Sequence, residues 1–314
     1  MLPRVLDGID AFLDQLTSVD LFPAVLAIFA HIARLACTST AWRNVLAAAY
    51  PDRSVRRLSI FGAYLAGVGV NAIVPIRAGD AVRVVLAHRA VPGSTYTTVV
   101  SSTLVLAIFD VAAASSLIVW AALTQDALPP LGELPDLPSF EFAWLLDHPL
   151  AAELLLAGVL IATVLVGIWI SGHVADFWER VRQAFAVVRR PALYLRSVAS
   201  WQAADWGLRF VTIWFLLDAF GIPQSLENVL LVQVSASVAT LVPLTPAGIG
   251  TEQAFLLYVF QGAVPAPDLL AFSVGMKLTT VTTNAIVGFT AIAVTLRTLR
   301  YRKALEPADD VPTS

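Results

Sequence analysis

The chain of 314 residues is 58% hydrophobic but only 14% charged, and its mean hydropathy is +0.76. Soluble proteins carry about a quarter charged residues, so this composition excludes a soluble enzyme and indicates a chain that crosses a membrane several times. The net charge of −3 offers no basic stripe for nucleic acid, and a single cysteine with four histidines that lack ligand spacing indicates no metal or other cofactor.

The first 16 residues predict an amphipathic helix in the membrane interface, because apolar residues recur every three or four positions. Three aspartates in this stretch argue against a cleaved signal peptide. A similar amphipathic helix is expected at 177–196. Crossing a hydrocarbon core of about 30 Å takes about 20 helical residues. Five apolar runs reach that length and are predicted to span the membrane: 19–39, 97–124, 150–171, 199–220 and 269–296.

The basic residues predict how these spans are oriented, because lysine and arginine near short loops stay on the cytoplasmic side. They gather at 43–57, 180–196 and 297–303, whereas residues 90–179 contain none. The acidic, proline-rich segment 125–149 falls in that gap and is predicted to lie outside. We therefore expect a multi-pass protein of the cytoplasmic membrane, with its N-terminus outside and its C-terminus in the cytoplasm.

Two further apolar stretches, 58–75 and 226–243, each end in Val-Pro followed by Ile or Leu and then by Ala-Gly. Proline removes a helix donor and glycine allows unusual backbone angles, so each break predicts a helix that stops and restarts. Basic residues flank the first stretch on both sides, whereas neither side of the second has any. We therefore predict two re-entrant, broken-helix hairpins of opposite orientation, at 58–92 and 226–264.

The predicted fold class is an all-α polytopic membrane protein with an inverted-topology repeat, a design in which substrate sites form near the midplane between broken helices. One transmembrane domain takes up the whole chain, with a first repeat at 1–124 and a second at 177–300. The span 150–171 links them, and 301–314 is expected to be a disordered cytoplasmic tail. Alternatively, both interrupted stretches are ordinary spans, which gives eight or nine helices and no repeat.

Ionisable residues at membrane depth are costly and therefore count as functional candidates. Arg209 and Lys277 fall near the middle of their predicted spans, and Asp110 occupies the place in the first repeat that Lys277 has in the second. Asp205 lies four residues before Arg209, so the two side chains can neutralise each other on one helix face. Lys277 either pairs with Asp110 in a packed interface or faces a polar cavity.

Two residues of the first predicted span are given no functional role. Arg34 lies close enough to the inner end of that span for its side chain to reach the interface. His31, one turn away, is expected to pack between helices.

The tip of the first hairpin is expected to bind an anion, because a restarting helix presents free backbone amides and the positive end of its dipole. Arg77 and Arg83 flank this point and suit a phosphate. Asp80 lies in the first turn of the return helix, where it either caps the helix or takes part in coupling. Asn71 is placed to close the hairpin or to hydrogen-bond across helices.

The tip of the second hairpin offers a different set of groups. Gly248 and Gly250 allow a ligand to approach the backbone closely. Glu252 follows at greater depth, where a carboxylate is expected to carry a proton or to pair with a cation.

Both tips resemble paired motifs of the transmembrane flippase region of lysylphosphatidylglycerol synthases. The family's first motif, roughly N-x-x-x-P-x-R-x-G-E-x-x-R, is matched with Asp80 in place of Glu by Asn71, Pro75, Arg77, Gly79 and Arg83. Its second, roughly P-x-x-P-G-G-x-G-x-x-E, is matched with Ala247 in place of a glycine, and with the acid one place closer, by Pro243, Pro246, Gly248, Gly250 and Glu252.

The resemblance extends over about residues 20–300 and departs furthest from the family in a third pattern. The family's basic residue in the last span appears here as Lys277. Its E-R-x-x-D pattern survives only as Asp110, because Leu106 and Ala107 occupy the other two positions. The loss of the Glu-Arg pair of this pattern leaves open which lipid such a flippase would move.

The resemblance implies a flippase for a membrane lipid: an anionic or aminoacylated phospholipid, or a lipid linked to a polyprenyl phosphate. Positive charge at its headgroup site is expected from Arg77, Arg83, Lys277 and Arg209. The family's soluble aminoacyl-transferase domain is not expected in this chain, so it is not predicted to be an enzyme. A second copy of the chain and a separate lipid-modifying enzyme are candidate protein partners.

Two other functions fit the sequence. An ion-coupled secondary transporter of a small anionic solute would use the same scaffold with a closed polar cavity. A membrane-embedded glycosyltransferase would need catalytic carboxylates in an outer loop, and 125–149 contains five acids. Their spread among prolines is more typical of a solvated loop.

Overall fold

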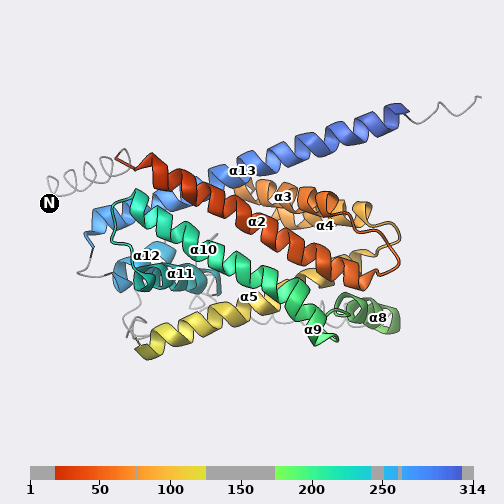
Figure 1. The fold of residues 1–314 in the computed structure, drawn as a ribbon, viewed down its shortest axis with the longest axis horizontal. Helices are drawn as coiled ribbons and strands as arrows, with labels where there is room; N and C mark the ends of the chain where they lie inside the picture. The colour runs from red at the N-terminus through yellow and green to blue at the C-terminus, as the bar shows by residue number, and fades with distance from the viewer. Residues whose placement is uncertain (1–17, 75–76, 125–173, 242–250, 261–263, 306–314) are drawn as a thin grey trace, which may run out of the picture.

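The computed structural model describes residues 18–74, 77–124, 174–241, 251–260 and 264–305. Within these residues the protein is all-helical, as predicted, and the helices form an elongated bundle (Figure 1). The helices are α2 (Leu21–Ala49), α3 (Arg57–Ile73), α4 (Ala78–Ala90), α5 (Tyr96–Thr124), α8 (Val174–Ala184), α9 (Pro191–Tyr194), the π-helical turn η1 (Leu195–Ala199), α10 (Ser200–Ala219), α11 (Leu226–Leu241), α12 (Thr251–Val259) and α13 (Ala266–Leu305).

Three described helices are long and apolar enough to cross a membrane: Leu21–Ala49, Tyr96–Leu123 and Ala266–Thr295. They correspond to three of the five predicted spans. The predicted span 199–220 is the helix α10, but three charged residues, Asp205, Arg209 and Asp218, interrupt its apolar character. The predicted span 150–171 and the amphipathic helix at 1–16 lie outside the described residues.

Three predicted boundaries differ from the structure. The first span, predicted to end at residue 39, continues as α2 to Ala49. The amphipathic helix expected at 177–196 ends as α8 at Ala184, and a new helix starts at Pro191, because proline has no N–H and favours the first turn of a helix. The tail expected at 301–314 is helical in its first five residues, since α13 continues to Leu305 through a run of good helix formers.

The first interrupted stretch forms two antiparallel helices, α3 and α4, and the chain breaks between them where the sequence predicts it. The Gly79 N–H donates to Asn71 Oδ1 at 2.8 Å, and a Cβ on Gly67 would lie 2.6 Å from the Gly79 carbonyl oxygen. Glycine at both positions therefore allows the two backbones to touch. The second interrupted stretch forms α11 and α12, which also pack together (Figure 1). Re-entry of these pairs into a membrane and the inverted repeat stay predictions.

The helices α2 and α10 run antiparallel along the length of the bundle (Figure 1). The Asp20 N–H donates to the Ala219 carbonyl at 2.9 Å at one end, and Asn44 Nδ2 donates to the Ser197 carbonyl at 2.6 Å at the other. The packing of α2 against α10 brings the charged residues of both helices together.

The buried core consists of two apolar clusters. One surrounds Trp42, which is 1% exposed and whose Nε1 donates to Ser102 Oγ at 2.8 Å. The other contains Ala27 of α2 and the edge-to-face pair of Phe220 and Phe272, with ring centroids 5.9 Å apart. Because Ala27 and Trp42 lie on the same helix, the part of α2 between them lies between the two clusters.

Packing of α3 against α13 depends on two glycines that face each other. A Cβ on Gly69 would lie 2.6 Å from the Cα of Gly288, which is closer than real atoms approach. We expect Gly69→Ala to lower the free energy of unfolding by roughly 1–3 kcal/mol, as overpacking does in well-packed cores. Chemical denaturation of the detergent-solubilised protein measures the change.

Gly207→Ala is the matched control, since a Cβ at this helical position in α10 meets no atom within 4 Å. Alanine is the better helix former there by up to about 1 kcal/mol, so this variant is expected to be as stable as the original or slightly more so. Equal destabilisation by both substitutions would contradict the close crossing of α3 and α13.

Candidate functional site

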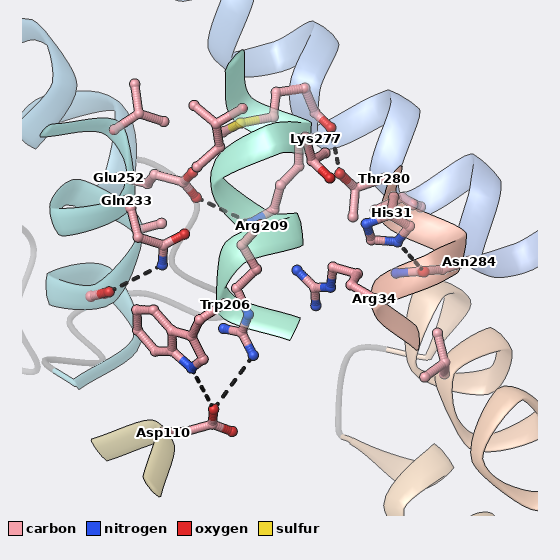
Figure 2. A pocket seen from close by; sticks show the side chains of 18 of the residues that line it. His31, Arg34, Asp110, Trp206, Arg209, Gln233, Glu252, Lys277, Thr280 and Asn284 are labelled. Carbon is pink, nitrogen blue, oxygen red and sulfur yellow. Dashed lines mark hydrogen bonds and ion pairs between the residues drawn. The ribbon is translucent and has the colours of Figure 1, made fainter. Parts of the chain in front are cut away.

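A cavity of about 660 Å³ lies in the middle of the bundle and is lined by residues of α2 to α5 and α10 to α13 (Figure 2). Both helix pairs with a broken connection contribute to it. Asn71 and Arg83 come from α3 and α4, and Gln233 and Glu252 come from α11 and α12. The volume is that of an ordinary small-molecule site, which runs from about 300 to 1,000 Å³.

The lining is mainly apolar but carries an excess of positive charge. Its acidic residues are Asp110 and Glu252. Its four basic residues, Arg34, Arg83, Arg209 and Lys277, exceed the acids by two charges. Each of the four forms an ion pair.

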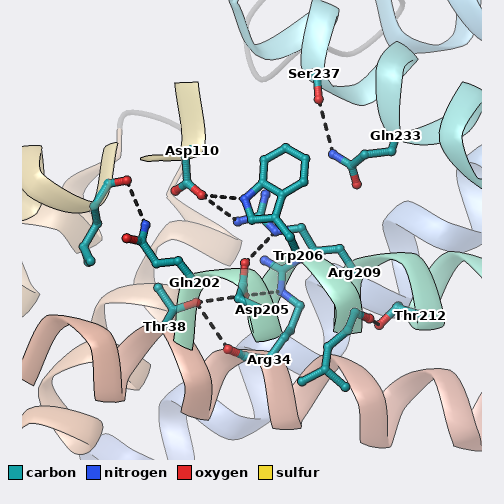
Figure 3. A network of polar contacts seen from close by, with 12 residues as sticks. Arg34, Thr38, Asp110, Gln202, Asp205, Trp206, Arg209, Thr212, Gln233 and Ser237 are labelled. Carbon is teal, nitrogen blue, oxygen red and sulfur yellow. Dashed lines mark hydrogen bonds and ion pairs between the residues drawn. The ribbon is translucent and has the colours of Figure 1, made fainter. Parts of the chain in front are cut away.

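Asp205 holds two of the arginines in place (Figure 3). Its side chain is only 3% exposed and does not line the cavity. Arg209 Nε lies 2.7 Å from Asp205 Oδ2, Arg34 Nε lies 3.5 Å from Oδ1, and Thr38 Oγ1 donates to Oδ1 at 2.8 Å. The pairing of Asp205 with Arg209 was predicted, whereas the contact with Arg34 was not.

Arg209 has further contacts that fix its guanidinium (Figure 3). Its Nη2 lies 3.6 Å from Asp110 Oδ1, which also accepts a 2.9 Å hydrogen bond from Trp206 Nε1. The guanidinium carbon lies 4.9 Å from the centroid of the Trp206 ring, within range of a cation–π interaction. Arg209 is therefore preorganised, and Asp110 pairs with it and not with Lys277.

Lys277 pairs with the acid of the second hairpin. Its Nζ lies 3.3 Å from Glu252 Oε2, and the Glu252 side chain is 8% exposed whereas that of Lys277 is 41% exposed. Of the roles predicted for Glu252, the structure shows the pairing with a cation. Nearby, Gln233 Nε2 donates to Ser237 Oγ at 3.3 Å, so α11 adds neutral polar groups to this side of the cavity.

Of the residues predicted at the first hairpin, Asn71 and Arg83 line the cavity, whereas Arg77 and Asp80 do not. Asn71 Nδ2 donates to Asp80 Oδ1 at 3.1 Å, so Asn71 closes the hairpin, and Arg83 Nη2 lies 3.3 Å from the same oxygen. Arg83 faces the cavity, but Asp80 is not part of its lining. Arg77 is exposed, with a left-handed φ of 53° before the first residue of α4, and it also lies outside the lining. Gly248 and Gly250 fall outside the described residues.

The structure adds side chains that were given no role from the sequence. Arg34 lies midway along α2 and faces the cavity, because this helix continues to Ala49 and not to residue 39. His31 packs between helices, as expected, but also lines the cavity and hydrogen-bonds Asn284 Oδ1 at 2.8 Å through Nε2. Trp206 is not among the residues predicted from the sequence, although an aromatic residue three positions before an intramembrane arginine is spaced for contact.

The arrangement suits an anion with several oxygens. Of the acids that pair with the four basic residues, Asp80 and Asp205 are not in the lining, so the net charge that meets a ligand is positive. Arg34 Nε and Arg83 Nε are buried and have no hydrogen-bond partner among the described residues. Arginine binds phosphate oxygens through its planar set of donors. No group of three or more His, Cys, Asp or Glu side chains in the described part of the chain is placed to hold a metal ion.

The chain matches a known protein family along most of its length. A family model described as the lysylphosphatidylglycerol synthase TM region matches residues 5–288, which is most of the 314-residue chain. No curated protein and no solved structure matches it.

Proposed function

Because the chain belongs to the family of lysylphosphatidylglycerol synthase transmembrane regions, we propose that it moves a lipid with a phosphate-bearing headgroup across the cytoplasmic membrane. The lipid is an anionic or aminoacylated phospholipid, or one linked to a polyprenyl phosphate. The chain acts as a carrier and not as an enzyme. Its N-terminus lies outside and its C-terminus in the cytoplasm.

The observation that carries this proposal is the charged cavity itself. Four basic side chains from four different helices, α2, α4, α10 and α13, face one space of about 660 Å³. Burying charges is costly unless partners compensate them; each of the four pairs with an acid, but Asp80 and Asp205 lie outside the lining, so the surface that a ligand meets has an excess of basic groups. A phosphate group complements these basic groups in charge and in a shape that arginine recognises.

The two helix pairs suggest how the cavity changes its access. Arg83 belongs to the α3–α4 pair and Glu252 to the α11–α12 pair, so each pair holds one charged residue against the headgroup site. If the pairs enter from opposite sides, rocking of one repeat against the other exposes the site to each leaflet in turn. The ion pair between Glu252 and Lys277 is then the contact that a proton or a headgroup would open.

Lipid movement in reconstituted liposomes tests the proposal. Fluorescent phosphatidylglycerol is placed in both leaflets, and added dithionite destroys only the fluorescence of lipid that reaches the outer leaflet. Protein is expected to lower the protected fraction below that of protein-free vesicles. An unchanged protected fraction, for phosphatidylglycerol and for a labelled polyprenyl phosphate, would contradict a flippase. Uptake of glycerol phosphate into the vesicles without lipid movement would instead support the solute transporter.

Within this assay, Arg83→Gln is expected to slow lipid movement by at least about tenfold, because a hydrogen bond to a charged group is worth roughly 1.5–3 kcal/mol. Arg89→Gln is the matched control, since Arg89 is an exposed arginine of the same helix that does not line the cavity. Arg77→Gln is expected to have a smaller effect than Arg83→Gln. Equal rates for Arg83→Gln and Arg89→Gln would remove Arg83 from the site.

A further inference from the structure

A second space lies between α2 and α13 and is apolar. Its volume is about 440 Å³. Three threonines of α13 between residues 279 and 283 contribute to it. The rest of its lining is aliphatic, namely Ile28, Ile32, Leu278, Ile286 and Val287. No charged side chain lines this groove, in contrast to the cavity described above.

The groove and the charged cavity share the same two helices. On α2, His31 and Arg34 line the cavity, whereas Ile28 and Ile32 line the groove. On α13, residues that line the two spaces also alternate at helical spacing. The two spaces therefore adjoin along the contact between α2 and α13, here called the seam. The hydrogen bond from His31 Nε2 to Asn284 Oδ1 crosses this seam at 2.8 Å.

The surroundings of the groove are those of a surface in contact with hydrocarbon. Phe29 is 66% exposed, Leu278 is 54% exposed and Ile286 is 62% exposed, and all three lie on the helices that form the groove. Both helices are long and apolar enough to cross a membrane. A polar ligand would lose its hydrogen bonds to water in such a space, so the occupant that fits is a hydrocarbon chain.

We propose that this groove holds an acyl chain of the same lipid whose phosphate-bearing headgroup occupies the charged cavity, with the chain passing between α2 and α13 beside His31 and Asn284. The inference rests on the proposed function and adds to it a site for the tail. A headgroup site and a tail site that adjoin along one seam match the two halves of an amphiphile. A charged cavity alone would not distinguish a lipid from a free phosphate ester.

Filling the groove tests the proposal. Ile32→Trp places a larger side chain in the groove from α2, and Thr282→Trp does so from α13 at an exposed position. Both variants are expected to slow the movement of fluorescent phosphatidylglycerol by at least about tenfold, the change that losing two buried methylene contacts would produce. The affinity of the purified full-length protein for glycerophosphoglycerol, the water-soluble headgroup, is expected to stay within twofold of the original in calorimetry.

Phe29→Trp is the matched control, because Phe29 is exposed on the same helix and lines neither space. It is expected to keep the original rate of lipid movement. Unchanged rates in Ile32→Trp and Thr282→Trp would contradict the tail site and leave the headgroup site standing. Weaker binding of glycerophosphoglycerol to both variants would also contradict the tail site, since the substitutions would then slow lipid movement by disturbing the charged cavity. If the original protein neither moves the lipid nor binds the headgroup, the proposed function itself fails.

Discussion

Asp205→Ala is expected to lower the free energy of unfolding by about 3–5 kcal/mol, the range measured when one partner of a buried ion pair is removed. Asp205 is 3% exposed and is the carboxylate that lies between Arg34, 3.5 Å away, and Arg209, 2.7 Å away. Without it, two guanidinium groups face each other inside the bundle. Unfolding of the detergent-solubilised protein, followed by tryptophan fluorescence, measures the loss.

Two further variants separate this effect from a general intolerance of α10 to substitution. Asp218→Ala removes an exposed acid from the same helix and is expected to change stability by no more than about 0.5 kcal/mol. Adding Arg34→Met to Asp205→Ala removes the arginine whose ion pair is lost with Asp205 and is expected to recover part of the stability, as contacting residues are not additive. Equal stability of Asp205→Ala and Asp218→Ala would show that Asp205 does not hold the arginines.

The sequence was sufficient to predict the elements but not how they meet. Periodicity and length identified α2, α5, α10 and α13, and the Val-Pro and Ala-Gly pattern located the end of α3 and the start of α4. These features depend on residues that are close together in the sequence. The pairing of Asp205 with Arg209 was predictable for the same reason, since four residues bring two side chains onto one helix face.

Contacts between segments that are far apart in the sequence could not be predicted from such local patterns. Lys277 was predicted either to pair with Asp110 or to face a polar cavity; it lines the charged cavity, and its ion pair there is with Glu252. Asp110 instead accepts the Trp206 indole N–H and lies near Arg209. Which of several buried acids a base meets is decided by how helices pack, and equivalence along the sequence does not fix that packing.

Arg34 shows how one misplaced boundary changes the function assigned to a residue. A span that ends at 39 puts Arg34 near the interface, where its long side chain could reach water. The structural helix continues to Ala49, so the same residue lies midway along α2 and faces the cavity. Trp42, buried in the core, and Asn44, bonded to the Ser197 carbonyl, explain why the helix continues beyond the apolar run.

Replacing either Arg34 or Arg209 with glutamine is expected to slow lipid movement by about a hundredfold, because losing one partner of a buried charge pair costs about 2–5 kcal/mol. Both side chains line the cavity, and Asp205, which pairs with both, lies outside the lining. Binding of glycerophosphoglycerol is expected to weaken in parallel with the rate. A merely structural role would lower stability without a matching change in the affinity of the remaining folded protein.

Lysine substitutions separate charge from shape at the same positions. Arg209→Lys keeps the charge that Asp205 neutralises but loses the planar donors and the stacking on Trp206, so it is expected to retain stability while slowing lipid movement by about tenfold. Arg189→Gln, an exposed arginine before α9, is the matched control and is expected to have no effect. If Arg34→Gln moves lipid as fast as Arg189→Gln, then Arg34 serves only to anchor α2, and the phosphate site narrows to Arg209, Arg83 and Lys277.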